Sequence, residues 1–160
     1  MFVGGNNAVS VLGLLQAPYE IWKAYHFGIN ATNQNIAGDT KDPDNDQVIN
    51  VLEYAFGSDP NNPGTSPPII GSVHSNQFDL QFNRNLCATD VTMLVQSMDS
   101  SNWSWSNCAS YSLASGWVMN AEGISVLESA ATGAPPDQHA TVTISESLRG
   151  FAFFRVMVAR

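Results

Sequence analysis

The chain has 160 residues, of which 44% are hydrophobic and only 12% are charged, and this composition is typical of a globular protein rather than a disordered one. Its formal net charge of −8, with only six lysines and arginines, argues against nucleic acid and anionic membranes as partners, because both require clustered cationic side chains. No stretch reaches the roughly 18 consecutive apolar residues of a membrane-spanning helix, so we expect no membrane span.

Residues 1–17 form an apolar N-terminal segment that contains no lysine or arginine. A signal peptide carries positive charge before its apolar core, so we interpret the segment as mature sequence or as the start of a fragment. Its apolar run is AVSVLGLL, residues 8–15. We expect this run to pack on its own domain, as a strand or against the first helix; the alternative is pairing with the sheet edge of a neighbouring molecule.

Residues 18–60 are predicted to form two short helices separated by an acidic loop. The first helix, PYEIWKAYHF at residues 18–27, has a proline at its first position and a glycine after its last, which are common start and stop residues. The second covers residues 51–56, where we expect Asn50 to cap the start and Gly57 to end the helix.

The acidic residues are concentrated in this loop. Six of the 14 lie between positions 39 and 59, where Lys41 is the one basic residue, so the segment carries −5 (six negative charges, one positive) of the total −8. Counted from Asp42, carboxylates occupy positions 1, 3, 5 and 12 and an asparagine occupies position 9, which is the pattern of a calcium-binding loop. The expected ligands are Asp42, Asp44, Asp46, the carbonyl oxygen of Val48, Asn50 and Glu53.

The predicted cofactor is Ca²⁺, because about six to eight oxygen ligands suit it better than Mg²⁺, which requires octahedral geometry. Position 6 of the loop holds Gln47 in place of the usual glycine. A left-handed backbone there costs a non-glycine residue about 1 to 3 kcal/mol, so we expect a weak site. The alternative is a solvated acidic turn without an ion.

Residues 61–68 have the proline, glycine and asparagine content of a linker, and beyond them the hydrophobic pattern changes to a period of two. Apolar residues alternate with polar ones in QFDLQFN at residues 77–83 and in ATVTIS at residues 140–145. Several such short segments, separated by turn residues, predict a mainly β fold: an antiparallel β-sandwich or jelly-roll-like domain over residues 69–160.

Three tryptophans of the predicted sandwich, Trp103, Trp105 and Trp117, are candidates for stacking on sugar rings, although aromatic residues at strand spacing more often pack in a core. The two cysteines, Cys87 and Cys108, lack the spacing of a metal site. They form a disulfide in an exported protein or remain buried thiols, and both alternatives stay open.

Catalytic motifs are missing from the sequence. It contains no G-x-S-x-G, no H-E-x-x-H and no phosphate-binding loop, and its three histidines are scattered along the chain. We therefore expect no enzymatic activity.

The stretch GDTKDPDNDQVINVLEYAFGSDPNNP, residues 38–63, resembles the calcium-binding loops of thrombospondin type 3 repeats and dockerins. The order of segments over residues 18–160 is similar to the C-terminal region of large secreted or surface proteins of environmental bacteria. That resemblance implies export, a calcium-loop segment followed by a β-sandwich, and a carrier or assembly role without catalysis.

We therefore expect a non-enzymatic, extracellular or cell-surface structural module that binds calcium. Its expected partners are other surface proteins or copies of itself. One alternative is a carbohydrate-binding β-sandwich. Another is a self-assembling subunit of a filament or surface layer, which would use strand addition through its N-terminal segment.

Overall fold

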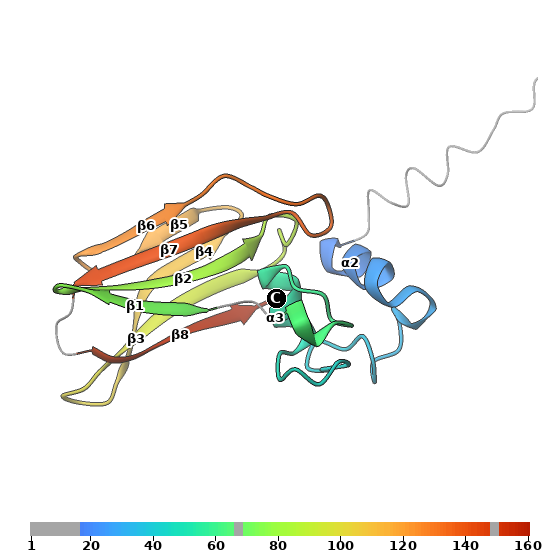
Figure 1. Cartoon of the computed structure of the whole chain (residues 1–160), viewed down its shortest axis with the longest axis horizontal. Helices are drawn as coiled ribbons and strands as arrows, with labels where there is room; N and C mark the ends of the chain where they lie inside the picture. Colours follow the sequence, from blue (N-terminus) through green and yellow to red (C-terminus); the bar gives the residue numbers. More distant parts are fainter. Residues whose placement is uncertain (1–16, 66–68, 148–150) are drawn as a thin grey trace, which may run out of the picture.

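The computed structural model describes residues 17–65, 69–147 and 151–160, so the apolar run at residues 8–15 lies outside the described residues. Two short helices, α2 (Pro18–Phe27) and α3 (Asn50–Phe56), lie with two 3-10 turns, η1 (Gly28–Asn30) and η2 (Pro63–Thr65), at one end of a β-sandwich (Figure 1). Neither helix in the described ranges has the length and apolar character needed to cross a membrane.

The described residues of the sandwich form eight strands in two four-stranded sheets. The order in one sheet is β1-β2-β7-β6 and in the other β5-β4-β3-β8, and every pairing is antiparallel. The prediction of a mainly β, antiparallel sandwich is confirmed. The strands are β1 (Ile70–His74), β2 (Gln77–Asn85), β3 (Thr92–Asp99), β4 (Trp105–Ser112), β5 (Gly116–Met119), β6 (Ile124–Glu128), β7 (His139–Ser147) and β8 (Phe151–Ala159).

The inward-facing side chains of both sheets meet in one hydrophobic core. Met93 and Val95 of β3 and Val142 of β7 are wholly buried there, as the alternating pattern requires. Helix α3 contributes to the same core, because Phe56 packs edge-on against Phe82 with ring centroids 5.8 Å apart. The helical segment and the sandwich therefore share a core, although the sequence places a linker between them.

A second cluster of buried side chains joins the two helices. Tyr19 and Trp22 of α2 stack with ring centroids 5.5 Å apart, and Tyr54 of α3 lies 4.9 Å from Tyr19. Tyr54 also connects to the sandwich, because its carbonyl oxygen accepts a hydrogen bond of 2.9 Å from Nδ2 of Asn85. Helix α3 thus lies between the two clusters and contributes side chains to both.

The start of α3 differs from the expectation. The helix begins at Asn50 itself, and the residue at the cap position is Ile49, which makes no side-chain cap. Asn50 instead donates two hydrogen bonds of 2.8 Å to the carbonyl oxygens of Ile36 and Gly38 and so ties the preceding loop to the helix. The end of the helix is as predicted, since Gly57 adopts a left-handed φ of 79° and closes the last turn.

Cys87 and Cys108 are not joined by a disulfide in the structure, although the sequence left that pairing open. Cys108 is buried in β4, where its thiol donates to the hydroxyl of Ser97 at 2.9 Å. Cys87 follows β2 and lies at the helical end of the sandwich, where it lines a cavity. The two side chains therefore have separate surroundings, and neither has the other as a partner.

Candidate metal centre

The acidic loop folds around its own carboxylates. Oδ1 of Asp42 accepts the backbone N–H of Asn45 at 2.8 Å and that of Asp46 at 3.3 Å, and Oδ2 accepts the N–H of Gln47 at 3.0 Å. Oδ1 of Asp46 accepts the N–H of Val48 at 2.8 Å. Aspartates form such local turns readily, so the spacing of the acids itself winds this stretch into a compact loop.

Three of the predicted ligands converge in the loop. Asp42, Asp44 and Asp46 each offer a carboxylate oxygen, and these oxygens lie within 4.8 Å of one another. Burial raises the pKa of Asp44, and the neighbouring charges of Asp46 and Asp42 raise it further. One of its oxygens is buried and has no hydrogen-bond partner among the described residues. Three carboxylates this close repel one another, and a hard cation among them would remove that repulsion.

Glu53, from the first turn of α3, is wholly buried. Its Oε1 accepts a hydrogen bond of 3.1 Å from the hydroxyl of Ser58, while its Oε2 has no partner among the described residues. No lysine, arginine or histidine in the described ranges forms an ion pair with it. Glu53 is not one of the three residues that lie within 4.8 Å of one another, but their charges act on it.

The pKa of Glu53 is raised to about 8, mainly by burial. The hydrogen bond from Ser58 opposes this shift, and the charges of Asp44, Asp46 and Asp42 add to it. With this pKa, metal-free Glu53 is mainly the neutral acid at neutral pH, because no cationic side chain of the described residues pairs with it to stabilise the carboxylate.

The remaining two predicted ligands also lie in or next to the loop. Asn50 is wholly buried, and its Oδ1 has no hydrogen-bond partner, although its amide group is fully engaged. Val48 is half-buried and follows Asp46 in the loop. Asn50 and Glu53 thus each hold a buried oxygen that is unpartnered among the described residues, on the helix that follows the three aspartates.

Gln47 has the backbone conformation expected for the glycine position of the motif. Its φ is 76°, and Asn45, two residues earlier, has a φ of 62°. Asparagine tolerates this left-handed region, whereas a glutamine there is strained. The loop therefore keeps the turn of the motif at a cost in stability.

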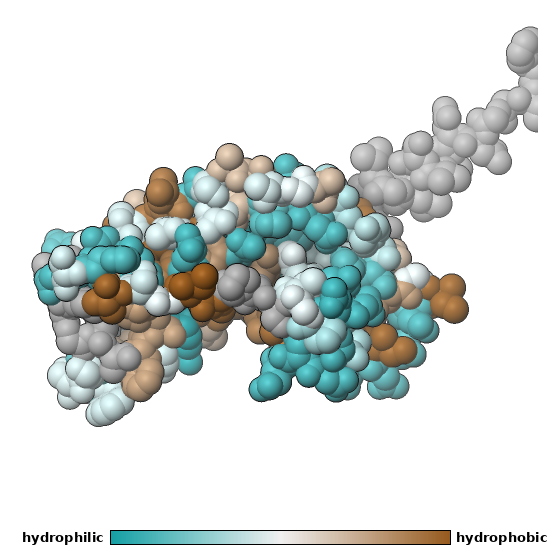
Figure 2. All heavy atoms as spheres, in the orientation of Figure 1, coloured by the Kyte–Doolittle hydropathy of each residue, from teal (hydrophilic) through white to brown (hydrophobic). Residues whose placement is uncertain are grey.

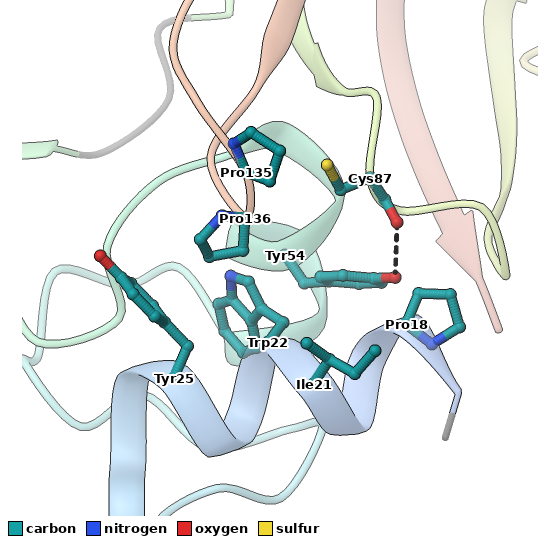
Figure 3. A pocket seen from close by; sticks show the side chains of 8 residues that line it. All are labelled: Pro18, Ile21, Trp22, Tyr25, Tyr54, Cys87, Pro135 and Pro136. Atoms are coloured by element: carbon teal, nitrogen blue, oxygen red, sulfur yellow. Dashed lines mark hydrogen bonds between the residues drawn. The ribbon is translucent and has the colours of Figure 1, made fainter. Parts of the chain in front are cut away.

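A cavity of about 490 Å³ lies beside the loop-bearing segment, between α2 and the sandwich (Figure 3). Its lining contains no charged side chain and consists of Pro18, Ile21, Trp22, Tyr25, Tyr54, Cys87, Pro135 and Pro136. Sequence reasoning missed this cavity, because its walls come from both helices and from two separate connections of the sandwich. A lining of this kind offers shape and hydrophobic contact but no carboxylate, amine, guanidinium or imidazole group.

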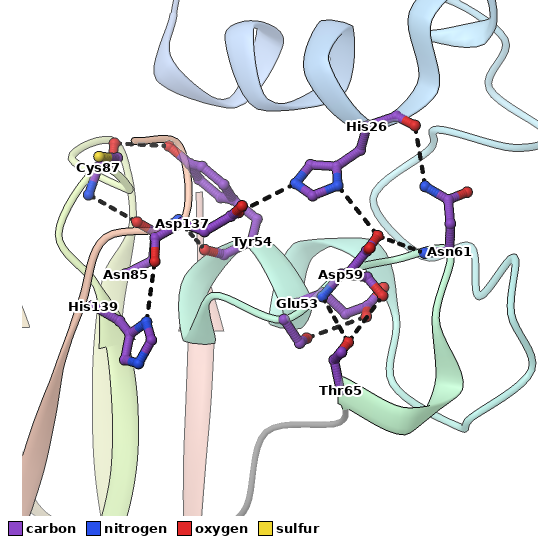
Figure 4. Close-up of polar contacts among 11 residues, drawn as sticks. His26, Glu53, Tyr54, Asp59, Asn61, Thr65, Asn85, Cys87, Asp137 and His139 are labelled. Atoms are coloured by element: carbon purple, nitrogen blue, oxygen red, sulfur yellow. Dashed lines mark hydrogen bonds and ion pairs between the residues drawn. The ribbon is translucent and has the colours of Figure 1, made fainter. Parts of the chain in front are cut away.

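Polar contacts connect α2 to the loop after α3 and to the loop before β7 (Figure 4). His26 is buried and lies between two carboxylates, with Nδ1 3.3 Å from Asp59 and Nε2 3.4 Å from Asp137. The carbonyl oxygen of His26 also accepts a hydrogen bond of 3.1 Å from Nδ2 of Asn61. His26 therefore holds the end of α2 against the loop after α3 and against the loop before β7.

The three tryptophans do not form one surface. Trp117 packs in the core against Phe82, and its indole N–H donates to Glu128 at 2.9 Å. Trp105 is half-buried under the guanidinium of Arg155, which lies 4.0 Å from its ring centroid. Trp103 is 64% exposed and has a φ of 56°.

Comparison with known proteins identifies no relative of this chain. No family model matches the chain, and no curated protein or solved structure matches it significantly. Any assignment for the acidic loop therefore rests on its own residues and their geometry.

The first prediction concerns Gln47. Gln47→Gly should raise the free energy of unfolding by about 1 kcal/mol in calcium, because glycine adopts the left-handed conformation without strain. Urea denaturation measures the change. Gln34→Gly is the control, since Gln34 is also exposed but has no positive φ. If Gln47→Gly is no more stable than Gln34→Gly, the turn is not strained.

The second prediction concerns Glu53 in the metal-free protein. Its folded pKa of about 8 lies above the ordinary value of 4.5, so the folded state keeps a proton that the unfolded state releases. This stabilisation is complete below about pH 4.5 and is lost as the pH rises through about 8. In EDTA, the melting temperature should therefore fall between pH 5 and pH 8.

Glu53→Gln should reduce that fall, because glutamine does not titrate. Glu122→Gln, at an exposed position, serves as the matched control and should leave the fall unchanged. An equally large fall in the Glu53→Gln variant would show that another group causes the pH dependence.

Proposed function

We propose that this chain is a non-enzymatic, extracellular structural module in which one Ca²⁺ bound by the acidic loop stabilises the helices against the β-sandwich. The observation that carries the proposal is the environment of the Glu53 side chain. It is wholly buried and has no ion-pair partner among the described residues. The charges of three converging aspartates also act on it. Without a counter-charge the buried Glu53 keeps its proton at neutral pH, and a bound cation would stabilise the charged carboxylate in place of that proton.

The chain's own residues fit such an ion. Asp42, Asp44 and Asp46 would hold it from the loop, and Glu53 and the free Oδ1 of Asn50 would approach from α3. The carbonyl oxygen of Val48 completes the proposed ligand set. These donors are all oxygens, which favours a hard cation over zinc or copper, and their number and flexibility favour Ca²⁺ over Mg²⁺.

The ion would act on the fold through α3. The residue after Glu53 is Tyr54, which packs with α2, and Phe56 packs in the core of the sandwich. Neither helix is long enough to be stable alone, since isolated helices shorter than about 12 residues are marginal in water. Fixing Glu53 would therefore fix the helix on which both clusters depend.

An extracellular location suits the strained loop. The left-handed Gln47 lowers the expected affinity, and weak sites of this kind fill at the millimolar calcium concentrations found outside cells. The resemblance of the loop to those of thrombospondin type 3 repeats and dockerins supports the same location. Other surface proteins or further copies of the chain are the proposed partners.

The test is a calcium titration by calorimetry, combined with thermal melts in calcium and in EDTA. Calcium should stabilise the native chain by about 2.7 kcal/mol at roughly 100 times the dissociation constant. The double variant Asp44→Asn, Glu53→Gln should lose both the binding and the stabilisation, and the Glu122→Gln variant should keep them. A native chain that calcium leaves unchanged, or a double variant that still responds, would refute the proposal.

A second candidate function, carbohydrate binding, has one specific observation in its favour. Trp103 is held exposed in a left-handed conformation, which is rare for a bulky residue, and its ring lies 6.4 Å from that of Phe153, which is 54% exposed. An aromatic pair presented in this way can stack on the apolar faces of sugar rings.

This candidate predicts that soluble polysaccharides such as xylan, mannan or β-glucan retard the native chain in affinity electrophoresis. Trp103→Ala should abolish the retardation without changing the melting temperature, because the ring is exposed. Tyr25→Ala, which removes an equally exposed ring from α2, should have no effect. Unretarded native protein, or retardation that survives Trp103→Ala, would exclude this surface.

A further inference from the structure

The outer faces of the two sheets differ in chemistry. On the sheet that contains β2 and β7, the outward-facing side chains of these central strands are polar, as in Gln81 and Asn83 of β2 and Thr141 and Thr143 of β7. Such polarity is usual where a sheet face contacts water. The opposite sheet instead exposes hydrophobic side chains on its outer face.

These exposed hydrophobic side chains come from several segments. Phe153 and Met157 of β8 and Val118 of β5 are 54%, 44% and 40% exposed. Each pairs in register with an outward-facing residue of the neighbouring strand, so all three point away from the core. The exposed ring of Trp103, in the loop after β3, lies beside Phe153. Hydrophobic side chains gathered at one surface in this way indicate a contact site.

The register of β8, β3 and β4 arranges this outer face in rows that cross the strands. Outward-facing residues that pair across neighbouring strands lie side by side. One row is hydrophobic, and the row next to it is polar. The hydrophobic row is Phe153, Met98 and Trp105, and the polar row is Arg155, Gln96 and Asn107.

The polar row is fixed by contacts among its own members. Nε of Arg155 donates to Oε1 of Gln96 at 2.7 Å, and Nε2 of Gln96 donates to Oδ1 of Asn107 at 2.7 Å. The guanidinium of Arg155 also lies over the ring of Trp105. Within the described ranges, the terminal nitrogens of Arg155 and Nδ2 of Asn107 have no hydrogen-bond partner. The row therefore presents several fixed N–H donors to solvent.

Arg155 also differs from the other two arginines that the structure describes. Arg84 pairs with Glu128 and Arg160 pairs with Asp39, whereas no carboxylate of the described residues pairs with Arg155. A planar guanidinium held in one orientation suits two adjacent oxygen acceptors. The surface is thus built for a ligand that combines an apolar face with adjacent oxygen atoms.

We propose that this outer face binds a neutral polysaccharide. Trp103 and Phe153 stack on the apolar C–H face of one sugar ring, and Arg155 donates hydrogen bonds to hydroxyl oxygens of the adjoining ring. Phe153 and Arg155 are two residues apart on the same face of β8, about 7 Å, so a short stretch of glycan reaches both. The inference rests on the second candidate function and adds the class of glycan and the residues that bind its hydroxyl groups.

The distribution of charge favours a neutral glycan. Arg155 is the one charged residue in the two rows, and polyanions require clustered cations. Figure 2 shows hydrophilic side chains gathered at the helical end, where the acidic loop lies, whereas the start of β8 is at the far end of the sandwich (Figure 1). An uncharged chain of sugar rings fits a surface with so little charge.

A second copy of the chain fits this face less well. A sheet of four strands about 4.8 Å apart, with strands of about eight residues, has a footprint of about 500 Å². Each partner of a standard protein interface buries about 800 Å². Two copies, each with a net charge of −8, also repel one another. The face is large enough for a few sugar rings and too small for a stable dimer.

Affinity electrophoresis at several glycan concentrations tests the inference, because it yields a dissociation constant for each variant. At least one of xylan, mannan and β-glucan should retard the native chain, and polygalacturonate should not. Arg155→Lys keeps the charge but loses the planar guanidinium, and Gln96→Ala releases Arg155, so each should weaken binding about tenfold or more. Gln81→Ala, at an exposed position on the outer face of the other sheet, is the matched control and should bind as the native chain does. Melting curves should show that all three variants are folded at the temperature of the assay.

Other outcomes would contradict the inference, and they separate it from the function on which it rests. If Arg155→Lys and Gln96→Ala bind as tightly as the native chain while Trp103→Ala does not bind, the aromatic pair acts alone and the candidate function stands. If no neutral glycan retards the native chain, the inference and the candidate function fail together. Retardation by polygalacturonate alone would make the ligand an anion. A dimer in light scattering that Phe153→Ala dissociates would make a second copy the occupant.

Discussion

The buried carboxylate of Glu53 couples the acidic loop to the rest of the protein. It belongs to α3, a helix of seven residues that supplies Tyr54 to one hydrophobic cluster and Phe56 to the other. Three aspartates act on it, and no cationic side chain of the described residues pairs with it. A cation bound by this carboxylate would take the place of its proton and would fix the helix on which both clusters depend.

We propose calcium as the ion bound at this site, because oxygen donors favour a hard cation, and this proposal would account for the uneven distribution of charge. The segment from Asp39 to Asp59 carries −5 of the net charge of −8, and repulsion among its carboxylates opposes the compact turn. Binding of an ion would convert that repulsion into a cross-link between the loop and α3. His26, between Asp59 and Asp137, holds α2 to the loop after α3 and to the loop before β7.

Local patterns predicted much of this structure, and long-range packing accounts for the differences. The alternation of apolar and polar residues in β2, which places Phe78 and Leu80 on the inward face, was sufficient to predict the sandwich. The spacing of the acidic residues counted from Asp42 was sufficient to predict that the three aspartates converge. The cap at Asn50 was wrong, because its amide is used by carbonyl oxygens 12 and 14 residues away. The cavity and the packing of Phe56 into the sandwich combine distant segments, and no single stretch encodes either.

The central claim, that the loop and Glu53 share one calcium ion, is tested most directly by a crystal structure grown in calcium, with an anomalous difference map. The account predicts one anomalous peak about 2.3 to 2.6 Å from carboxylate oxygens of Asp42, Asp44, Asp46 and Glu53. A map without a peak in the loop, or a peak held by the aspartates alone while Glu53 remains buried and uncoordinated, would contradict it.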